Sequence, residues 1–333
     1  YDDIADHRGE LVRDYHVLTD ETIAPIVAAE DPDRPFWPSS PASAPEGGGD
    51  PNDPSRGDSH YWDVWHAATG PEDWLAHRAR FVSESGFQSY PSLATLATVL
   101  GPENWNITSP LMEYRQRARF GNLFLFRKLL AWFRMPKDFA SLVYASQQLQ
   151  ARILKLLIEH WRREHPYCMG VVYWQLNDIW PGPSWSSVEY GGRWKPLHYQ
   201  LARSYAPVLV SARVAAGNLE VWVSNDTREA LTGEASWVLH AWGGEILGRW
   251  AAPFATGPGE SVCVWRGTLP ESRTGPGFLI LAAHWPGGMV GNEHWLGLPK
   301  DAELAVPQLR VYDWRREGRR IEFHPGPARH LDD

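Results

Sequence analysis

The chain has 333 residues, of which 43% are apolar and 22% charged, the usual balance for a soluble globular protein. A net charge of −8 without any run of Lys and Arg argues against a nucleic-acid surface, and no stretch is apolar for long enough to span a bilayer. Cys168 and Cys263 match no metal-ligand spacing, and we expect neither a disulfide nor a metal site from them. Tryptophan is unusually frequent, with 19 copies, and some of these flat side chains would suit the C–H faces of sugar rings.

The first part of the chain alternates predicted helices with predicted strands. An apolar residue every three to four positions predicts a helix over 9–29, and a Gly, Pro and Asp-rich loop follows 41. A short helix is expected near 71–77. Apolar and aromatic runs predict buried strands over 34–40, 60–66 and 79–87.

Residues 92–165 are predicted to be mostly helical. The longest helix should run from Asp138, a suitable N-cap, to Glu164, since its apolar residues form one broad face. A nearly continuous apolar run over 169–178 predicts a strand that is buried on both faces. Strands that alternate with helices indicate a parallel sheet, and four such strands fit the C-terminal half of a (β/α)8 TIM barrel.

The residue pattern changes after Leu201. Short alternating strands with Gly and Asn-containing turns predict an antiparallel, immunoglobulin-like β-sandwich, and 309–324 reads as one further hairpin. The fold class is therefore α/β plus all-β. We expect the half barrel over 1–201, the sandwich over 202–306 and the start of a further β unit over 307–333.

Several motifs carry a family resemblance. Three segments resemble the β-mannosidase branch of glycoside hydrolase family 2: GDPNDPSRGDSHYWDVWH (49–66), SESGFQSYPS (83–92) and YWQLNDIWPGPSWSSVEYGGRWKPLHY (173–199). They occur in the same order as in that family. The resemblance covers about residues 1–310. It implies a glycosidase acting on β-mannosides, with no cofactor.

For Glu84 the resemblance implies a specific role. The Glu of the family's S-E-x-G-F-Q motif ends barrel strand seven and is the catalytic nucleophile. Chemistry agrees, because retaining glycosidases need a carboxylate held rigidly beside the anomeric carbon. The family usually has an aromatic residue after the nucleophile, where this chain has Ser85. Since side chains alternate along a strand, Ser85 should point away from the face that carries Glu84.

The stretch HYWDVWH splits by alternation into two faces. His60, Trp62, Val64 and His66 fall on one of them. By the resemblance this strand end hydrogen-bonds the nucleophile and walls the sugar subsite, and we choose Trp62 and His66 for these tasks. The alternative is a set of packed aromatics with a satisfied histidine. A zinc site from the two histidines is not expected, because no third ligand is placed near them.

The last predicted barrel strand ends in YWQLND. Trp174 resembles the family's platform under the sugar, and Asn177 and Asp178 belong to its signature. Asp178 could instead cap the following turn. Trp180 could line the rim or simply pack, and the Gln88 amide could brace the loop that follows the nucleophile.

The general acid/base should be a Glu in an Asn-Glu motif at the end of barrel strand four, and no motif of that kind lies in the barrel part of this sequence. Residues 1–31 resemble the segment just after it. We therefore expect an interior fragment of a retaining exo-β-mannosidase, inactive by itself. Rival readings are another family 2 exo-glycosidase (β-glucosaminidase, β-galactosidase or β-glucuronidase) and a non-catalytic carbohydrate-binding protein. No compartment is predicted.

Overall fold

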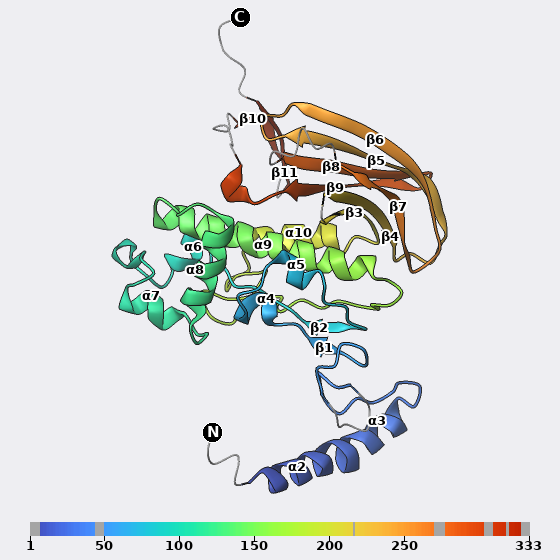
Figure 1. Ribbon diagram of the computed structural model, residues 1–333. Helices are drawn as coiled ribbons and strands as arrows, with labels where there is room; N and C mark the ends of the chain where they lie inside the picture. The colour runs from blue at the N-terminus through green and yellow to red at the C-terminus, as the bar shows by residue number, and fades with distance from the viewer. Residues whose placement is uncertain are drawn as a thin grey trace, which may run out of the picture.

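A computed structural model describes residues 7–43, 50–215, 217–269, 277–302, 309–317 and 320–327 (Figure 1). A mostly helical part lies beneath a β-sandwich, and the long helix α9 (Phe139–Arg163) runs between them. Each part has its own apolar core, one formed by residues between Tyr61 and Leu201 and the other by residues between Val208 and Ala283. None of the helices in the described ranges is long and apolar enough to cross a membrane.

The predicted N-terminal helix is confirmed. It consists of α2 (Arg8–His16), the π-helical turn η1 (Val17–Ile23) and α3 (Ala24–Glu30), and it lies apart from the rest of the molecule in Figure 1. Most of its large apolar side chains are exposed, among them Leu18 and Ile26.

The strand predicted over 34–40 is wrong. This segment is irregular, with bends at 34 and 38–40, and Trp37 is exposed. Pro35 and Pro38 explain the difference, because neither has the N–H that a strand interior needs.

Two short parallel strands support the candidate site. In β1 (Ser59–His60) and β2 (Val82–Glu84), His60 pairs with Glu84. The prediction of a strand over 60–66 is wrong beyond its first residue, because the chain turns at Trp62 into helix α4 (Asp63–His66). The predicted short helix after it is confirmed as α5 (Pro71–Trp74).

The segment 169–178 is extended but is not a regular strand. It follows β2 in the parallel sense, with bonds from Val82 N to Gly170 O at 2.9 Å and from Val172 N to Val82 O at 2.8 Å. Val172, Trp174 and Leu176 are exposed, so the predicted burial on both faces is wrong. The parallel direction agrees with the expected architecture, while the half barrel itself stays a prediction.

The region between β2 and the extended segment 169–178 is mostly helical, as predicted. Asp138 caps α9, since its carboxylate accepts a 2.7 Å bond from the Ser141 N–H. The remaining helices are α6 (Leu93–Leu96), η2 (Pro102–Asn104), α7 (Pro110–Arg115), α8 (Gly121–Trp132) and, after the extended segment, α10 (Pro196–Ser204).

The predicted sandwich is confirmed as two antiparallel sheets, with strand orders β3-β4-β7 and β6-β5-β8-β9. Cys168 and Cys263 are free thiols, and the predicted hairpin over 309–324 is also present. The strands are β3 (Val208–Ala215), β4 (Asn218–Asn225), β5 (Leu231–Ala241), β6 (Ile246–Thr256), β7 (Glu260–Thr268), β8 (Gly277–Trp285) and β9 (Gly288–Leu296), followed by the turn η4 (Pro299–Asp301) and the hairpin of β10 (Leu309–Glu317) and β11 (Arg320–Pro327).

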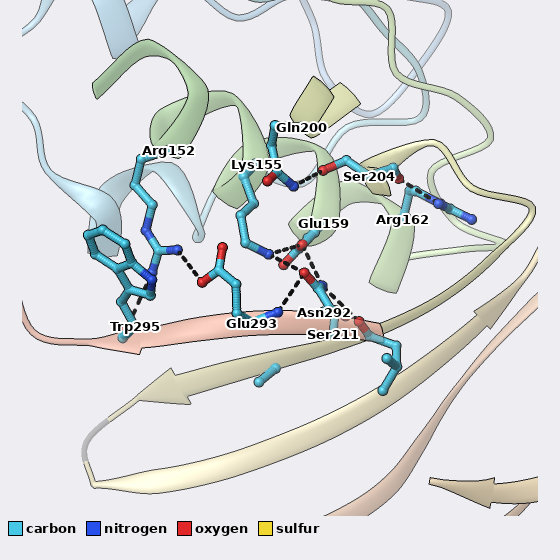
Figure 2. Close-up of polar contacts among 12 residues, drawn as sticks. Arg152, Lys155, Glu159, Arg162, Gln200, Ser204, Ser211, Asn292, Glu293 and Trp295 are labelled. Carbon is cyan, nitrogen blue, oxygen red and sulfur yellow. Dashed lines mark hydrogen bonds and ion pairs between the residues drawn. The ribbon is translucent and has the colours of Figure 1, made fainter. Parts of the chain in front are cut away.

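Buried polar side chains join helix α9 to the sandwich (Figure 2). Lys155 and Glu159, each 1% exposed, form an ion pair one helical turn apart. Asn292 of β9 bonds to both, accepting from Lys155 Nζ at 2.7 Å and donating to Glu159 Oε1 at 2.8 Å. Because these groups satisfy one another inside the protein, the helix and the sandwich hold each other in one arrangement.

Candidate active site

Glu84 stands at the C-terminal end of β2, and its side chain is 27% exposed. The Trp62 indole donates a hydrogen bond from Nε1 to Glu84 Oε2 at 3.2 Å, and His60 Nδ1 lies 3.3 Å from the same oxygen. Among the described residues, these two polar contacts of the carboxylate both fall on Oε2. No polar contact within the described ranges is recorded for Oε1.

Aromatic rings form one wall beside Glu84. The Trp62 ring meets the Trp185 ring edge-on at 6.0 Å, and Trp65 packs on Trp185 at 5.7 Å. His66, predicted at a strand end, lies instead on helix α4, where it is exposed, 6.2 Å from the Trp62 ring and 5.7 Å from the Phe124 ring. Trp62 thus contacts the carboxylate directly, whereas His66 lies beside the Trp62 ring.

Glu84 and Ser85 lie in different environments, as expected from alternation. Ser85 is fully buried behind the site while Glu84 reaches solvent. Trp174 N donates to Ser85 O at 2.8 Å, which anchors the Trp174 segment beside the end of β2. The Trp174 side chain is 41% exposed, and its peptide bond to Gln175 is cis.

Gly86 permits the close approach of these two segments. A Cβ at this position would lie 2.2 Å from Trp174 O and 3.2 Å from the Trp185 ring. We expect Gly86→Ala to lower the unfolding free energy by about 1–3 kcal/mol, because backbone must move to admit the methyl group. Denaturant titration measures the loss, with Gly243→Ala as control, since a Cβ there meets nothing within 4 Å. An unchanged midpoint for Gly86→Ala would contradict this packing.

Asp178 belongs to a buried polar cluster. It is 9% exposed and accepts a 2.7 Å bond from Ser186 Oγ, while Asn177 is exposed and donates to the Asp178 carbonyl at 3.3 Å. Burial raises the pKa of the Asp178 carboxyl, and the Lys195 charge and the Ser184 and Ser186 hydroxyls offset part of this rise. The arrangement agrees with the turn-bracing alternative for Asp178.

Lys195 gives this cluster a pH dependence. Burial lowers the pKa of Lys195 to about 8, although the charges of Asp178 and Glu189 oppose the change. Above pH 8 the folded protein releases a proton that the unfolded chain keeps until about pH 10.4, so stability should rise with pH in this window, by up to about 3 kcal/mol. We expect the unfolding free energy of the parent to increase relative to Lys195→Met between pH 8 and 10. A constant difference between the two would contradict the assignment.

Trp180 contacts the last residue of α7, and Gln88 contacts the residue that follows it. Trp180 Nε1 donates to Arg115 O at 3.1 Å, and the Arg115 guanidinium lies 4.6 Å from the centre of the Trp180 ring. Gln88 is fully buried, and its Oε1 accepts from Gln116 Nε2 at 2.9 Å. The contacts of Trp180 agree with the packing alternative. The contact of Gln88 agrees with the expected bracing of the loop that follows Glu84.

The choice of Trp62 and His66 overlooked His60. Its position two residues before Trp62 in the alternating pattern was the available signal. The Asn52 side chain holds the His60 backbone from both sides, accepting from its N–H at 2.6 Å and donating to its carbonyl at 2.9 Å. Asn52, in the described part of the Gly, Pro and Asp-rich loop, therefore holds the His60 backbone beside Glu84.

Two other features bear on the chemistry. The sequence contains one Asn-Glu pair, Asn292-Glu293, and it lies on β9, where Asn292 bonds to α9 and Glu293 pairs with Arg152. It is part of the interface with the sandwich and not the acid/base motif of a barrel strand. Within the described ranges, no three His, Cys, Asp or Glu side chains cluster closely enough to hold a metal ion.

The chain is similar to several known proteins. Residues 217–301 match the family model of the mannosidase Ig/CBM-like domain. The β-mannosidase of Capra hircus is 34% identical over 300 residues, which cover 83% of this chain and 33% of that protein. The β-mannosidase of Rattus norvegicus is 35% identical, with 70% of this chain and 28% of that protein covered.

A solved structure extends the likeness to three dimensions. The crystal structure of the β-D-mannosidase from Dictyoglomus thermophilum matches with a TM-score of 0.80 and 29% identity, over 89% of this chain and 36% of that one. The chain spans about a third of the length of the curated relatives it matches. With its family motifs, its sandwich and these relatives, the chain belongs to the β-mannosidase branch of glycoside hydrolase family 2.

Proposed function

We propose that the protein containing this chain is a retaining exo-β-mannosidase, which removes terminal non-reducing β-D-mannose from β-mannosides. One observation carries the proposal: Glu84, at the end of a parallel strand, has Oε2 held by Trp62 and His60, while no polar contact within the described ranges is recorded for Oε1. A carboxylate fixed in this way suits attack on an anomeric carbon. The surrounding fold would be the C-terminal half of a TIM barrel.

In the proposed reaction, Oε1 of Glu84 attacks the anomeric carbon and forms a mannosyl ester. The bond to the leaving oxygen breaks, and that oxygen takes a proton from the general acid. Water, deprotonated by the same group, then attacks the anomeric carbon and releases mannose with retained configuration. The exposed Trp174 face would stack on the sugar, leaving its hydroxyls free for hydrogen bonds.

The acid/base is proposed to lie outside this sequence. The one Asn-Glu pair present serves the interface between α9 and the sandwich, and the matched relatives are about three times as long as the aligned region. A missing acid/base typically costs about 10²–10⁴-fold in rate on ordinary leaving groups. We therefore propose that the 333-residue chain alone does not hydrolyse natural β-mannosides.

A panel of 4-nitrophenyl β-glycosides tests this function in the full-length protein. We expect kcat/KM for the β-mannoside to exceed that for the gluco, galacto, glucuronic acid and glucosamine substrates. Proton NMR of the first-formed sugar should show β-mannose, which reports retention. A higher kcat/KM for another sugar would overturn the substrate, and sugar binding without any turnover would overturn the enzymatic reading.

A further inference from the structure

A cleft of about 870 Å³ lies between the helical part and the sandwich, and Glu84 is not among the residues that line it. Arg152 and Arg163 of α9 line this cleft together with His294 of β9, and each of these three basic side chains is at most 8% exposed. The acidic residues of the lining are instead all exposed: Glu72, Asp73 and Asp301. Water screens the exposed carboxylates more strongly than the buried cations, so the interior of the cleft is electropositive.

Arg163 is a buried cation without a counter-charge. Within the described ranges it forms no ion pair with an Asp or Glu oxygen at 4.0 Å or less. Burial lowers the pKa of Arg163 to about 10, against the opposing effect of the Glu159 charge, so the guanidinium stays charged at neutral pH. Its two hydrogen bonds both leave Nη1, to Ser211 Oγ at 3.2 Å and to Ala212 O at 3.4 Å. Nε and Nη2, the pair of donors that matches two oxygens of an anion, are unused among the described residues.

The neighbouring cations differ in their pairing. Arg152 pairs with Glu293 at 3.3 Å, and Lys155 pairs with Glu159. Arg213 of β3 also lines the cleft, half-buried, and has no ion pair within the described ranges. The cleft therefore contains two guanidinium groups that none of the described carboxylates balances at ion-pair distance.

His294 supplies a second unused polar group. Nδ1 of its ring is buried and has no hydrogen-bond partner in the described part of the chain. Burial, together with the smaller effects of the Arg152, Lys155 and Arg163 charges, holds the pKa of His294 well below its usual range. The ring is therefore neutral, and a neutral imidazole keeps one N–H that it can donate.

An oxyanion would satisfy both residues. Water can accept hydrogen bonds from these N–H groups, but it does not neutralise a buried guanidinium, which is costly to leave unpaired. Two oxygens of a phosphate or sulfate would accept from Nε and Nη2 of Arg163, and a third would accept from the His294 ring. The volume of the cleft is also in the range of pockets that hold a whole small molecule.

From these contacts we propose that the cleft between α9 and the sandwich binds a tetrahedral oxyanion, with Arg163 as its ion-pair partner and His294 as a further donor. The ligand is a phosphate or sulfate group, either free or carried on a sugar-sized molecule. The site is separate from Glu84, so the proposal does not depend on the proposed function. A ligand held by α9 and β9 together should also stabilise the folded protein.

Isothermal titration calorimetry of the full-length protein tests the site with inorganic phosphate, inorganic sulfate, glucose 6-phosphate and glucose. We expect saturable binding of at least one anion, and no binding of glucose that depends on Arg163. Tighter binding of glucose 6-phosphate than of inorganic phosphate would support an oxyanion carried on a sugar, and equal or weaker binding would support a free ion. Absence of saturable binding for all three anions would overturn the proposal.

Three variants locate the binding site. Arg163→Met should weaken anion binding by about 10- to 100-fold, the usual cost of losing hydrogen bonds to a charged group, and His294→Leu by about 2- to 10-fold. Arg249→Met, which removes an exposed arginine from β6, should keep the parent affinity. Unchanged affinity in both Arg163→Met and His294→Leu would place the anion elsewhere and refute the proposal.

Thermal melts of the same proteins give a second measure. The bound anion should raise the unfolding temperature of the parent and of Arg249→Met, and this rise should be smaller in His294→Leu and absent in Arg163→Met. His294→Leu leaves the guanidinium in place, so it provides the decisive comparison if Arg163→Met does not fold. An equal rise in the parent and His294→Leu, with equal affinities, would then contradict the site.

Discussion

Replacing Glu84 by glutamine in the full-length protein is expected to lower kcat on 4-nitrophenyl β-mannoside by about 10⁴- to 10⁶-fold, the range found when a covalent nucleophile or its activating partner is removed. Glutamine keeps the size of the side chain and an oxygen that can accept from Trp62, but it cannot form the glycosyl ester. Folding should be little affected, because Glu84 is partly exposed. Steady-state kinetics and a thermal melt measure both effects.

Two further variants sharpen this prediction. In Glu84→Ala the vacated space should admit azide, which would restore turnover and give the α-mannosyl azide of opposite configuration. Glu103→Gln, an exposed glutamate in η2, should keep the parent rate. Parent-like kcat in Glu84→Gln would remove Glu84 from the chemistry.

The largest expected loss of stability comes from Glu159→Gln. Lys155 and Glu159 are each 1% exposed, and the substitution leaves the Lys155 ammonium buried with the Asn292 amide but without its counter-charge. Breaking a buried ion pair at one partner costs about 3–5 kcal/mol. Denaturant unfolding of the 333-residue chain, followed by tryptophan fluorescence, should show a loss of this size.

A double variant separates the lost pairing from lost packing. Lys155→Met with Glu159→Leu removes both charges and fills much of the same space, so it should be far more stable than Glu159→Gln. Glu234→Gln, on the exposed side of β5, should behave like the parent. If Glu159→Gln loses less than about 1 kcal/mol, the pair does not hold α9 to the sandwich in the way described.

The parts of the fold that follow a clear period were predictable from sequence. Apolar spacing identified α9 together with its Asp138 cap, and alternation identified the strands of the sandwich. The stretch 60–66 was not, because its alternating aromatics also fit a helix that starts after a two-residue strand. Val64 and Trp65 are both buried there, which a strand exposed on one face does not allow.

The candidate site was predictable where a motif carries it. The motif around Glu84 and the alternation of Glu84 with Ser85 pointed to the open end of β2. The contact of His60 with Glu84 was not anticipated, because it depends on the pairing of β1 with β2 and on Asn52, which lies in a loop without periodic pattern. For Gln88 the sequence already suggested bracing, and for Asp178 it offered a turn-capping alternative, but their partners Gln116 and Ser186 are visible only in the structure.

The most direct test of the central claim is covalent labelling of the full-length protein with a 2-deoxy-2-fluoro-β-mannosyl fluoride. The electron-withdrawing fluorine slows breakdown of the glycosyl ester, so the adduct should accumulate and survive digestion. Mass spectrometry should find it on Glu84, within the tryptic peptide that runs from Phe81 to Arg115. A label on another carboxylate, or no label from this reagent while β-mannosides are hydrolysed, would contradict Glu84 as the nucleophile.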